Sequence, residues 1–316
     1  MVRMKLRALW HVVAATALAV MVVVSAIVVW LRHDDPVPRF SERRGRIATV
    51  TLDSATVERG HIVQGARVYS TSGVALDLLI KRPAHGRPGP LVVLLGGHAT
   101  GRSAARLVPD TRGRVVVALS YPYAGPHRMN PLEVLRWAPA IRRGLLDAPP
   151  AVQIALDYLL AQPYIDRREV HGMGASLGTP FMTVAAAIDP RITHVWSVHG
   201  AGNSRAMLTH NAKESVPDVL APLTGFLADV LVAGPYLSPE RWVGQVSPRP
   251  FHMINATADE RLPRHTIMTL YDAAAEPKSL TWLPGLHVQR NRPEVVRGLV
   301  SAVFDRMDSE TLPGDR

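Results

Sequence analysis

The sequence predicts an α/β protein with a mostly parallel, doubly wound sheet, preceded by one N-terminal transmembrane helix. Two observations predict the sheet. Short, continuously apolar runs at 91–95 and 114–120 are typical of parallel strands buried on both faces. Later apolar runs alternate with segments of helical periodicity. The third observation, a long uncharged run behind N-terminal basic residues, predicts the membrane helix.

The composition limits the possible function classes. A chain of 316 residues can form one α/β domain of about 250 residues beyond its first segment. Because cysteine is absent, disulfides, thiolate metal sites and a cysteine nucleophile are excluded. The net charge is +10, but the basic residues are spread along the chain rather than clustered on one predicted face. We therefore expect no nucleic-acid partner.

Residues 1–31 are predicted to be a membrane anchor or a signal segment. Three basic residues precede an uncharged run from 8 to 31, which is bracketed by Trp10 and Trp30. The alternative is a cleaved signal peptide, with Val24-Ser25-Ala26 as the cleavage site and a secreted product. For the anchor we expect the N-terminus inside, the rest of the chain extracytoplasmic, and the basic residues of the following segment near lipid headgroups.

Residues 32–64 are expected to form a polar juxtamembrane linker and a first strand near 47–52. The main domain is expected over 65–310, beginning with a hairpin of 66–71 and 74–81 that turns at Ser72-Gly73.

The rest of the domain continues the alternation of strands and helices. Further strands are expected at 169–173, 193–198, 250–256 and 279–283, and helices at 150–162, 177–188, 266–275 and 293–306. Two stretches, about 124–149 and 201–240, are too long to be simple connections. We expect them to be cap-like insertions that shape a substrate pocket.

The most informative motif is Gly174-Ala175-Ser176-Leu177-Gly178, a G-x-S-x-G sequence between a predicted strand and a predicted helix. Such a turn holds a serine hydroxyl exposed at its tip, and its glycines relieve the crowding around it. Ser176 is therefore the candidate nucleophile.

A serine nucleophile needs a base, and the base needs an orienting carboxylate. Asp259 lies in the loop after the predicted strand 250–256, at the sheet edge where ligands bind. His287 lies in the loop after the last predicted strand. Glu260 is the alternative acid. The alternative histidines are His194, His199, His252 and His265; His194 and His252 lie within strands, and His199 follows a strand directly and is expected to line the site.

These motifs together resemble the α/β-hydrolase superfamily, closest to its dienelactone-hydrolase-like and prolyl-oligopeptidase-like branch. In that branch the acid lies in a D-x-x-x-P loop and the base in a G-x-H loop. Asp259 with Pro263 and Gly285 with His287 match this pattern and are in the expected order after Ser176. The resemblance covers roughly residues 65–305 and implies a triad of Ser176, Asp259 and His287.

The same resemblance implies an oxyanion hole of two backbone N–H groups, from Leu177 and from His98. Ala99 is the alternative to His98, because Gly96-Gly97-His98 stands where relatives often have His-Gly-x. Tyr121 and Tyr123 are expected to form aromatic walls. Thr179 replaces a glycine of many relatives, and we expect it to affect substrate fit.

The implied function is a serine hydrolase, most simply a carboxylic-ester hydrolase that acts on a small-molecule ester through an acyl-enzyme. This chemistry requires no metal and no organic cofactor. A serine peptidase is one alternative function. A catalytically silent, membrane-tethered binding protein is the other.

Overall fold

The computed structural model describes residues 33–97, 100–123, 125–126, 131–289 and 291–310, together with scattered positions between 11 and 29. The chain divides into two units, Met1–Pro36 and Val37–Arg316. The predicted transmembrane segment, 8–31, lies largely outside the described residues. Within the part of the chain that is described, no helix combines the length and apolar character needed to cross a membrane.

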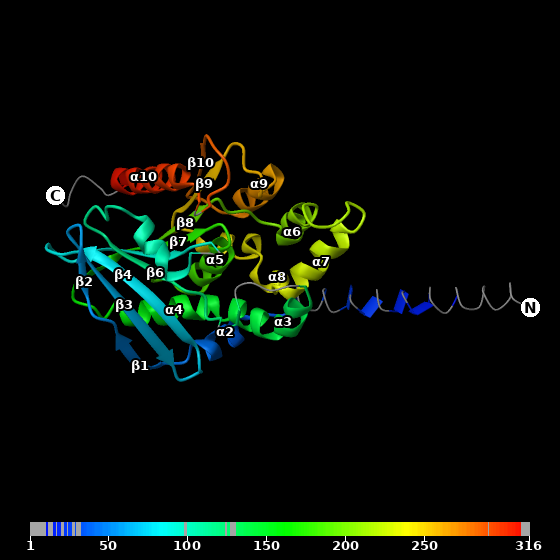
Figure 1. Ribbon diagram of the computed structural model, residues 1–316, viewed down its shortest axis with the longest axis horizontal. Coiled ribbons are helices and arrows are strands. Elements are labelled where there is room, and N and C mark those ends of the chain that lie inside the picture. The colour runs from blue at the N-terminus through cyan, green and yellow to red at the C-terminus, as the bar shows by residue number, and fades with distance from the viewer. Residues whose placement is uncertain are drawn as a thin grey trace, which may run out of the picture. The chain divides into compact units, whose positions relative to one another are not determined.

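The second unit contains all the strands named here (Figure 1). They are β1 (Ile47–Leu52), β2 (Thr56–Glu58), β3 (His61–Ser70), β4 (Ala75–Pro83), β5 (Gly89–Leu95), β6 (Val115–Leu119), β7 (Ile165–Ala175), β8 (His194–Val198), β9 (Phe251–Ala256) and β10 (Lys278–Leu283). The α-helices are α2 (Val37–Arg44), α3 (Pro131–Leu146), α4 (Ala148–Leu159), α5 (Gly178–Ile188), α6 (Ser204–Ala212), α7 (Ala221–Leu231), α8 (Gly234–Leu237), α9 (Arg264–Ala273) and α10 (Pro293–Glu310). Three 3₁₀ helices are η1 (Gly101–Leu107), η2 (Pro239–Arg241) and η3 (Val243–Val246).

One mixed sheet organises this unit. Its strand order is β1-β3-β4-β6-β5-β7-β8-β9-β10, with β2 paired to β3. The six strands from β6 to β10 in this order run parallel, and the first strands form an antiparallel edge. The β3–β4 hairpin turns at Gly73, whose φ of +82° favours glycine. The prediction of a mostly parallel sheet is confirmed.

Helices cover both faces of the sheet, as continuous apolar strands require (Figure 1). On one face, α10 and η1 pack against the strands through an apolar layer that includes Val116, Trp196 and Phe304. On the other face lie α4 and α5, whose side chains are almost entirely buried. The carboxyl ends of the parallel strands meet at one edge, where ligands bind in sheets of this kind.

The region expected to be a linker is partly folded onto the domain. Helix α2 buries Phe40 completely, and Arg43 of this helix forms a two-fold hydrogen-bonded ion pair with Asp147 at 2.7 Å. Arg44 pairs with Asp157 in the same manner. The folded unit therefore begins near Val37 rather than at 65, because these contacts tie a short polar helix to α4 and its N-terminus.

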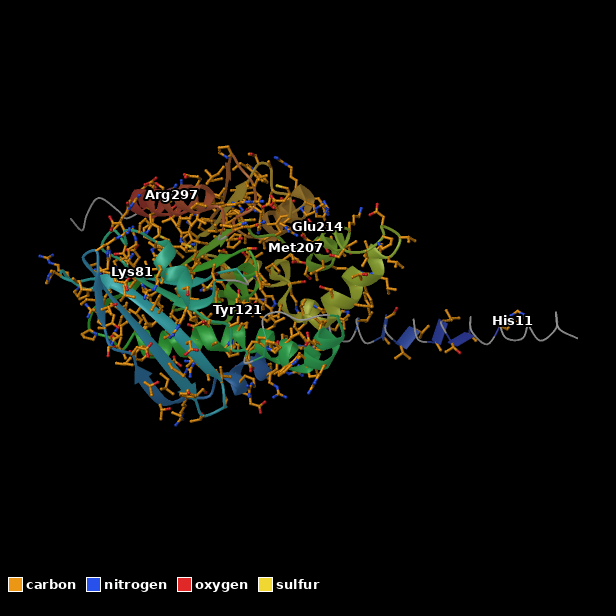
Figure 2. All side chains as sticks on the ribbon, in the orientation of Figure 1. His11, Lys81, Tyr121, Met207, Glu214 and Arg297 are labelled. Carbon is orange, nitrogen blue, oxygen red and sulfur yellow. The ribbon has the colours of Figure 1, made fainter. Side chains whose placement is uncertain are left out.

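The two expected insertions are largely helical. The first contains α3, and the second contains α6, α7 and α8. Helix α6 is capped by Asn203, which has a positive φ of 51° and accepts a hydrogen bond from the Ala206 N–H. Ser204, Met207 and Asn211 of α6 line the cavity above the carboxyl edge of the sheet (Figure 2 labels Met207).

Candidate active site

Ser176 lies at the sharp turn between β7 and α5, where its φ of +53° is a conformation that side chains rarely adopt. The Ser176 N–H donates to the Val198 carbonyl oxygen at 2.9 Å, which fixes the turn. A Cβ on Gly174 would lie 2.6 Å from the Thr179 Cα, and one on Gly178 would lie 2.0 Å from the Leu95 oxygen. Both glycines of the motif are therefore needed for backbone packing.

His287 meets Ser176 from the loop between β10 and α10. Its Nε2 lies 2.8 Å from the Ser176 Oγ, and the residue is 5 % exposed. The His287 backbone N–H donates to Glu260 Oε2 at 2.9 Å. Gly285, with a φ of +127°, turns the chain just before this residue. The loop thus holds the imidazole by its backbone as well as by its ring.

Asp259 orients the imidazole from its other side. Its Oδ2 lies 2.8 Å from His287 Nδ1, while its Oδ1 accepts the N–H groups of Arg261 and Leu262 at 2.9 Å each. Burial by itself raises the pKa of Asp259, but the contacts with His199 and His287 outweigh it, so the pKa lies well below its ordinary value. The carboxyl group is therefore ionised at neutral pH.

Glu260, the alternative acid, has a different position. Its carboxylate accepts the His287 main-chain N–H and forms an ion pair with Arg292. Burial raises the pKa of Glu260, and these hydrogen bonds more than compensate and lower it. Glu260 supports the loop of His287, whereas Asp259 contacts the ring.

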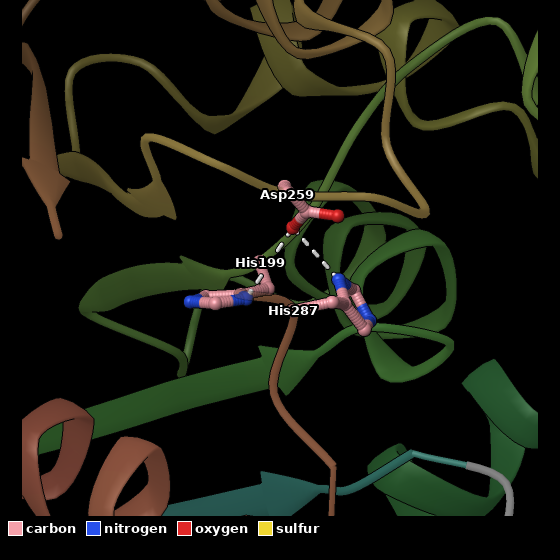
Figure 3. A group of neighbouring side chains, drawn as sticks. All are labelled: His199, Asp259 and His287. Atoms are coloured by element: carbon pink, nitrogen blue, oxygen red, sulfur yellow. Dashed lines mark hydrogen bonds and ion pairs between the residues drawn. The ribbon is translucent and has the colours of Figure 1, made fainter. Parts of the chain in front are cut away.

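A second histidine joins the site. His199 follows β8 directly, with a positive φ of 49° and 1 % exposure. Its ring stands edge-on to that of His287, with centroids 5.3 Å apart, and its Nδ1 lies 3.4 Å from Asp259 Oδ2 (Figure 3). The Val288 N–H donates to the same Nδ1 at 2.9 Å. His199 therefore contacts both the acid and the loop that carries the base.

Only its position directly after a strand indicated from the sequence that His199 lies near the site. The sequence did not predict its contacts with Asp259 and with the loop that carries His287. The other alternative histidines lie elsewhere. His194 and His252 are in the sheet, and His265 is exposed on α9.

Among the described residues, His199, Asp259 and His287 are also the group whose donor atoms converge closely enough to hold a metal, within 4.8 Å of one another. Asp259 and His287 are hydrogen-bonded to each other, and His287 Nε2 is bonded to Ser176. A metal ion bound between these donor atoms would have to break the hydrogen bonds that join Ser176, His287 and Asp259.

One predicted oxyanion donor can be placed. Leu177 directly follows Ser176 at the N-cap of α5, where helix N–H groups and the helix dipole favour negative charge. His98 and its alternative, Ala99, lie outside the described residues. Gly97 lies next to the nucleophile, since a Cβ on it would be 3.9 Å from the Ser176 Cβ. The loop that follows β5 therefore begins beside the nucleophile.

Tyr121 supports this loop instead of forming a wall of the cavity. Its hydroxyl donates to the Gly96 oxygen at 2.7 Å, and its ring packs edge-on against Phe181. Burial raises the pKa of Tyr121, so the hydroxyl keeps its proton for this bond. Tyr123 donates to the Pro126 oxygen in the following segment.

Thr179 lies behind the nucleophile. Its hydroxyl donates to the Gly174 oxygen at 3.1 Å, and its side chain occupies the space that a Cβ on Gly200 would need. Thr179 is 1 % exposed and is not among the residues that line the cavity. The expectation that it shapes substrate fit therefore finds no support in its position.

A cavity of about 700 Å³ opens at Ser176 and His287. A volume of this size is typical of small-molecule sites, for which roughly 300–1,000 Å³ is common. Its walls are mostly hydrocarbon side chains from the sheet, η1 and α10.

Neither a known protein-family profile nor a curated protein sequence matches this chain. Many solved structures are similar to it. An acetyl xylan esterase from a Thermoanaerobacterium species is 15 % identical, with a TM-score of 0.60 over 86 % of this chain and 94 % of that one. An acetyl xylan esterase from a Paenibacillus species is 15 % identical, with a TM-score of 0.62 over 84 % and 92 %.

A cold-adapted esterase from an Arctic intertidal metagenomic library is 19 % identical, with a TM-score of 0.55 over 82 % of this chain and 99 % of that one. At such low sequence identities, the structural similarity is evidence for the fold alone. The strand order and the turn at Ser176 agree with it. The chain therefore has the α/β-hydrolase fold.

Proposed function

We propose that this protein is a serine hydrolase that cleaves carboxylic esters through an acyl-enzyme on Ser176. The observation that carries the proposal is the continuous hydrogen-bonded series Ser176–His287–Asp259 at the opening of an apolar cavity. A serine hydroxyl is a poor nucleophile unless a positioned base takes its proton. Here the base lies within reach, and a buried carboxylate holds its ring.

In the proposed reaction, Ser176 Oγ attacks the ester carbonyl carbon while His287 Nε2 takes the hydroxyl proton. Asp259 stabilises the imidazolium, and the Leu177 N–H faces the oxyanion. The carbon–oxygen bond then breaks, and His287 gives its proton to the leaving alcohol. Water attacks the acyl-enzyme with His287 again as base, which releases the carboxylic acid and restores Ser176.

Esters are favoured over peptides by the names of the similar structures, two of which are acetyl xylan esterases and one a cold-adapted esterase. The test is labelling by a fluorophosphonate, which reacts with activated serines. We expect labelling and ester hydrolysis by the native protein and loss of both in Ser176→Ala. A well-folded native protein that neither labels nor hydrolyses esters would refute the proposal and favour a binding role. Faster cleavage of a dipeptide amide than of esters would favour a peptidase.

We also propose that residues 1–31 anchor the catalytic domain to a membrane, with the domain on the extracytoplasmic side. This rests on the uncharged run and its flanking basic and tryptophan residues alone. Expression of the full chain, followed by membrane fractionation, alkaline carbonate extraction and protease accessibility, tests it. An anchored protein stays in the membrane pellet with an intact N-terminus. A mature N-terminus near Ala26 in the soluble fraction would instead indicate a cleaved signal peptide.

A further inference from the structure

Helix α7, in the second insertion, exposes only apolar side chains to solvent. The exposed residues between 219 and 231 are Val219, Leu220, Pro222, Leu223 and Leu227. Val219 is 83 % exposed, and the three leucines are 48 %, 57 % and 58 % exposed. Leu220, Leu223 and Leu227 follow helical spacing and therefore share one face. A group of large apolar side chains on a surface marks a binding site for a protein or a membrane.

The opposite face of α7 is packed against α6. Its buried residues are Ala221, Gly225 and Asp229, and a Cβ on Gly225 would lie 2.6 Å from the Thr209 nitrogen of α6. Asp229 is the only charged residue between 219 and 231, and it accepts a hydrogen bond from the Ser204 hydroxyl on this inner side. Helices α6 and α7 stand at one end of the second unit, away from the sheet (Figure 1). The exposed face of α7 therefore points away from the core of the unit.

The size of this face favours a lipid surface over a protein partner. A standard protein–protein interface uses about 20–30 residues on each side, far more than the exposed residues of α7. The other large apolar side chains that are exposed in the described part of the second unit lie on β1, β2 and β3 and in the loop before His287: Leu52, Val57, Tyr69 and Leu286. A bilayer requires no matching surface, and a single helix can insert a few leucines into it.

The chain also enters the second unit close to α7. Only residues 32–36 separate the uncharged run from α2, and the chain from Leu31 to Val37 spans at most about 20 Å. Helix α2 lies beside α8, the next helix after α7, because the Arg39 guanidinium stands 5.6 Å from the centre of the Tyr236 ring. A bilayer that holds the uncharged run is therefore within reach of this part of the unit.

Arginine side chains lie against the same helices. Arg205 of α6 lies over the Phe226 ring, 4.7 Å from its centre, and Arg142 of α3 donates to the Val230 oxygen of α7. Guanidinium groups beside an apolar face match the phosphate groups of a lipid surface. Asp218, just before α7, is exposed and carries the opposite charge, so the test below includes vesicles with and without anionic lipid.

From these observations we infer that the exposed face of α7 docks on a lipid bilayer, with Leu223 and Leu227 inserted below the headgroups. The other side of the hairpin lines the cavity, through Ser204, Met207 and Asn211 of α6. A docked α7 therefore orients the cavity, with α6 between it and the membrane. This inference rests on the proposed anchor for the nearness of the bilayer, and it adds a second contact with the membrane.

The absence of cysteine allows a direct test, because a single new cysteine carries a single fluorescent probe. The full chain is reconstituted in phosphatidylcholine vesicles, with or without phosphatidylglycerol, and the environment-sensitive dye NBD is attached in Leu223→Cys, Leu227→Cys or Val57→Cys. Val57 is the matched control, an apolar residue of β2 that is 73 % exposed. We expect blue-shifted emission at 223 and 227, and quenching by shallow doxyl lipids at least about twofold stronger there than at 57.

A double variant removes most of the face without changing the packed side of the helix. Leu223→Gln combined with Leu227→Gln is read by the same dye in Val219→Cys. Doxyl quenching at 219 should fall at least about twofold, because the leucines that insert into the bilayer are gone. Thermal unfolding and hydrolysis of a water-soluble ester should stay at native values.

Water-like emission at both 223 and 227 in vesicles would overturn the inference. So would a blue shift that grows with protein density and shows no doxyl quenching, since that result identifies a second copy of the chain on this face. If alkaline carbonate releases the full chain from membranes, the proposed anchor fails alone. The same probes, read before and after vesicles are added, then still decide whether α7 binds lipid.

Discussion

Replacing Asp259 by asparagine tests the proposed triad most sharply, because the structure determines how the new amide must lie. Asp259 Oδ1 accepts two main-chain N–H groups, from Arg261 and Leu262, while Oδ2 faces His287 Nδ1. In Asp259→Asn the amide oxygen must take the place that faces the two N–H donors. The NH₂ group must then face the imidazole.

This orientation reverses the direction of one hydrogen bond. The new NH₂ donates to His287 Nδ1, so the neutral ring carries its proton on Nε2 and can no longer accept the proton of Ser176. Loss of the correct tautomer in a serine triad lowers kcat by about 10⁴-fold, which corresponds to about 5.4 kcal/mol of the activation barrier. We expect a loss of that order with little change in KM.

Steady-state hydrolysis of a p-nitrophenyl ester at pH 7.5, with fluorophosphonate labelling beside it, measures the effect. Glu260→Gln is the matched control, because its remaining carbonyl oxygen can still accept the main-chain N–H of His287. We expect this control to stay within about tenfold of the native rate, the cost of weakening one charged hydrogen bond. A loss below tenfold in Asp259→Asn, or a larger loss in Glu260→Gln, would refute the assignment of Asp259.

Three further outcomes are expected. His199→Phe keeps a ring against His287 but removes the acceptor of a loop N–H, so kcat should fall about tenfold with a shifted pH–rate profile and nearly constant KM. Gly178→Ala should abolish activity and lower the unfolding temperature, because the added Cβ would lie 2.0 Å from the Leu95 oxygen, whereas Gly298→Ala, with open space around it, should be neutral or slightly stabilising. Burial, followed by repulsion from a neighbouring histidine, lowers the pKa of His194 to about 4, so the unfolded chain takes up this proton first as pH falls below about 6.5. Because the ring is partly exposed and solvent screens its charge, stability should drop by on the order of 1–2 kcal/mol between pH 6.5 and 4, and urea unfolding should show a smaller drop in His194→Gln.

Much of the fold could be predicted from the sequence because its signals are local. Continuous apolar runs predict buried strands such as β5. The glycines on either side of Ser176 indicate a turn in which no side chain fits at those two positions. The loops that carry Asp259 and His287 follow predicted strands, so their meeting at one edge of the sheet follows from parallel topology.

Other features depend on contacts between distant residues, which no local pattern reports. The sequence around Phe40 is typical of a polar linker. It becomes a helix of the domain through the burial of Phe40 and through the ion pairs of Arg43 and Arg44 with residues more than a hundred positions away. Tyr121 was expected at the substrate, but its hydroxyl is bound to a carbonyl oxygen of the loop before η1. In both cases the partner decides the role of the side chain.

The depth of the cavity is the clearest example, because its lining residues are indistinguishable in sequence from an ordinary core. Beside this lining, the same face of the sheet carries a row of rings that crosses β7, β8 and β9. His171 stacks on His194 and accepts the Trp196 N–H, and Trp196 lies against His252. This row closes the apolar layer with hydrogen-bonded groups. The same row contains His194, so the side chains that close the apolar layer also make the fold sensitive to acid.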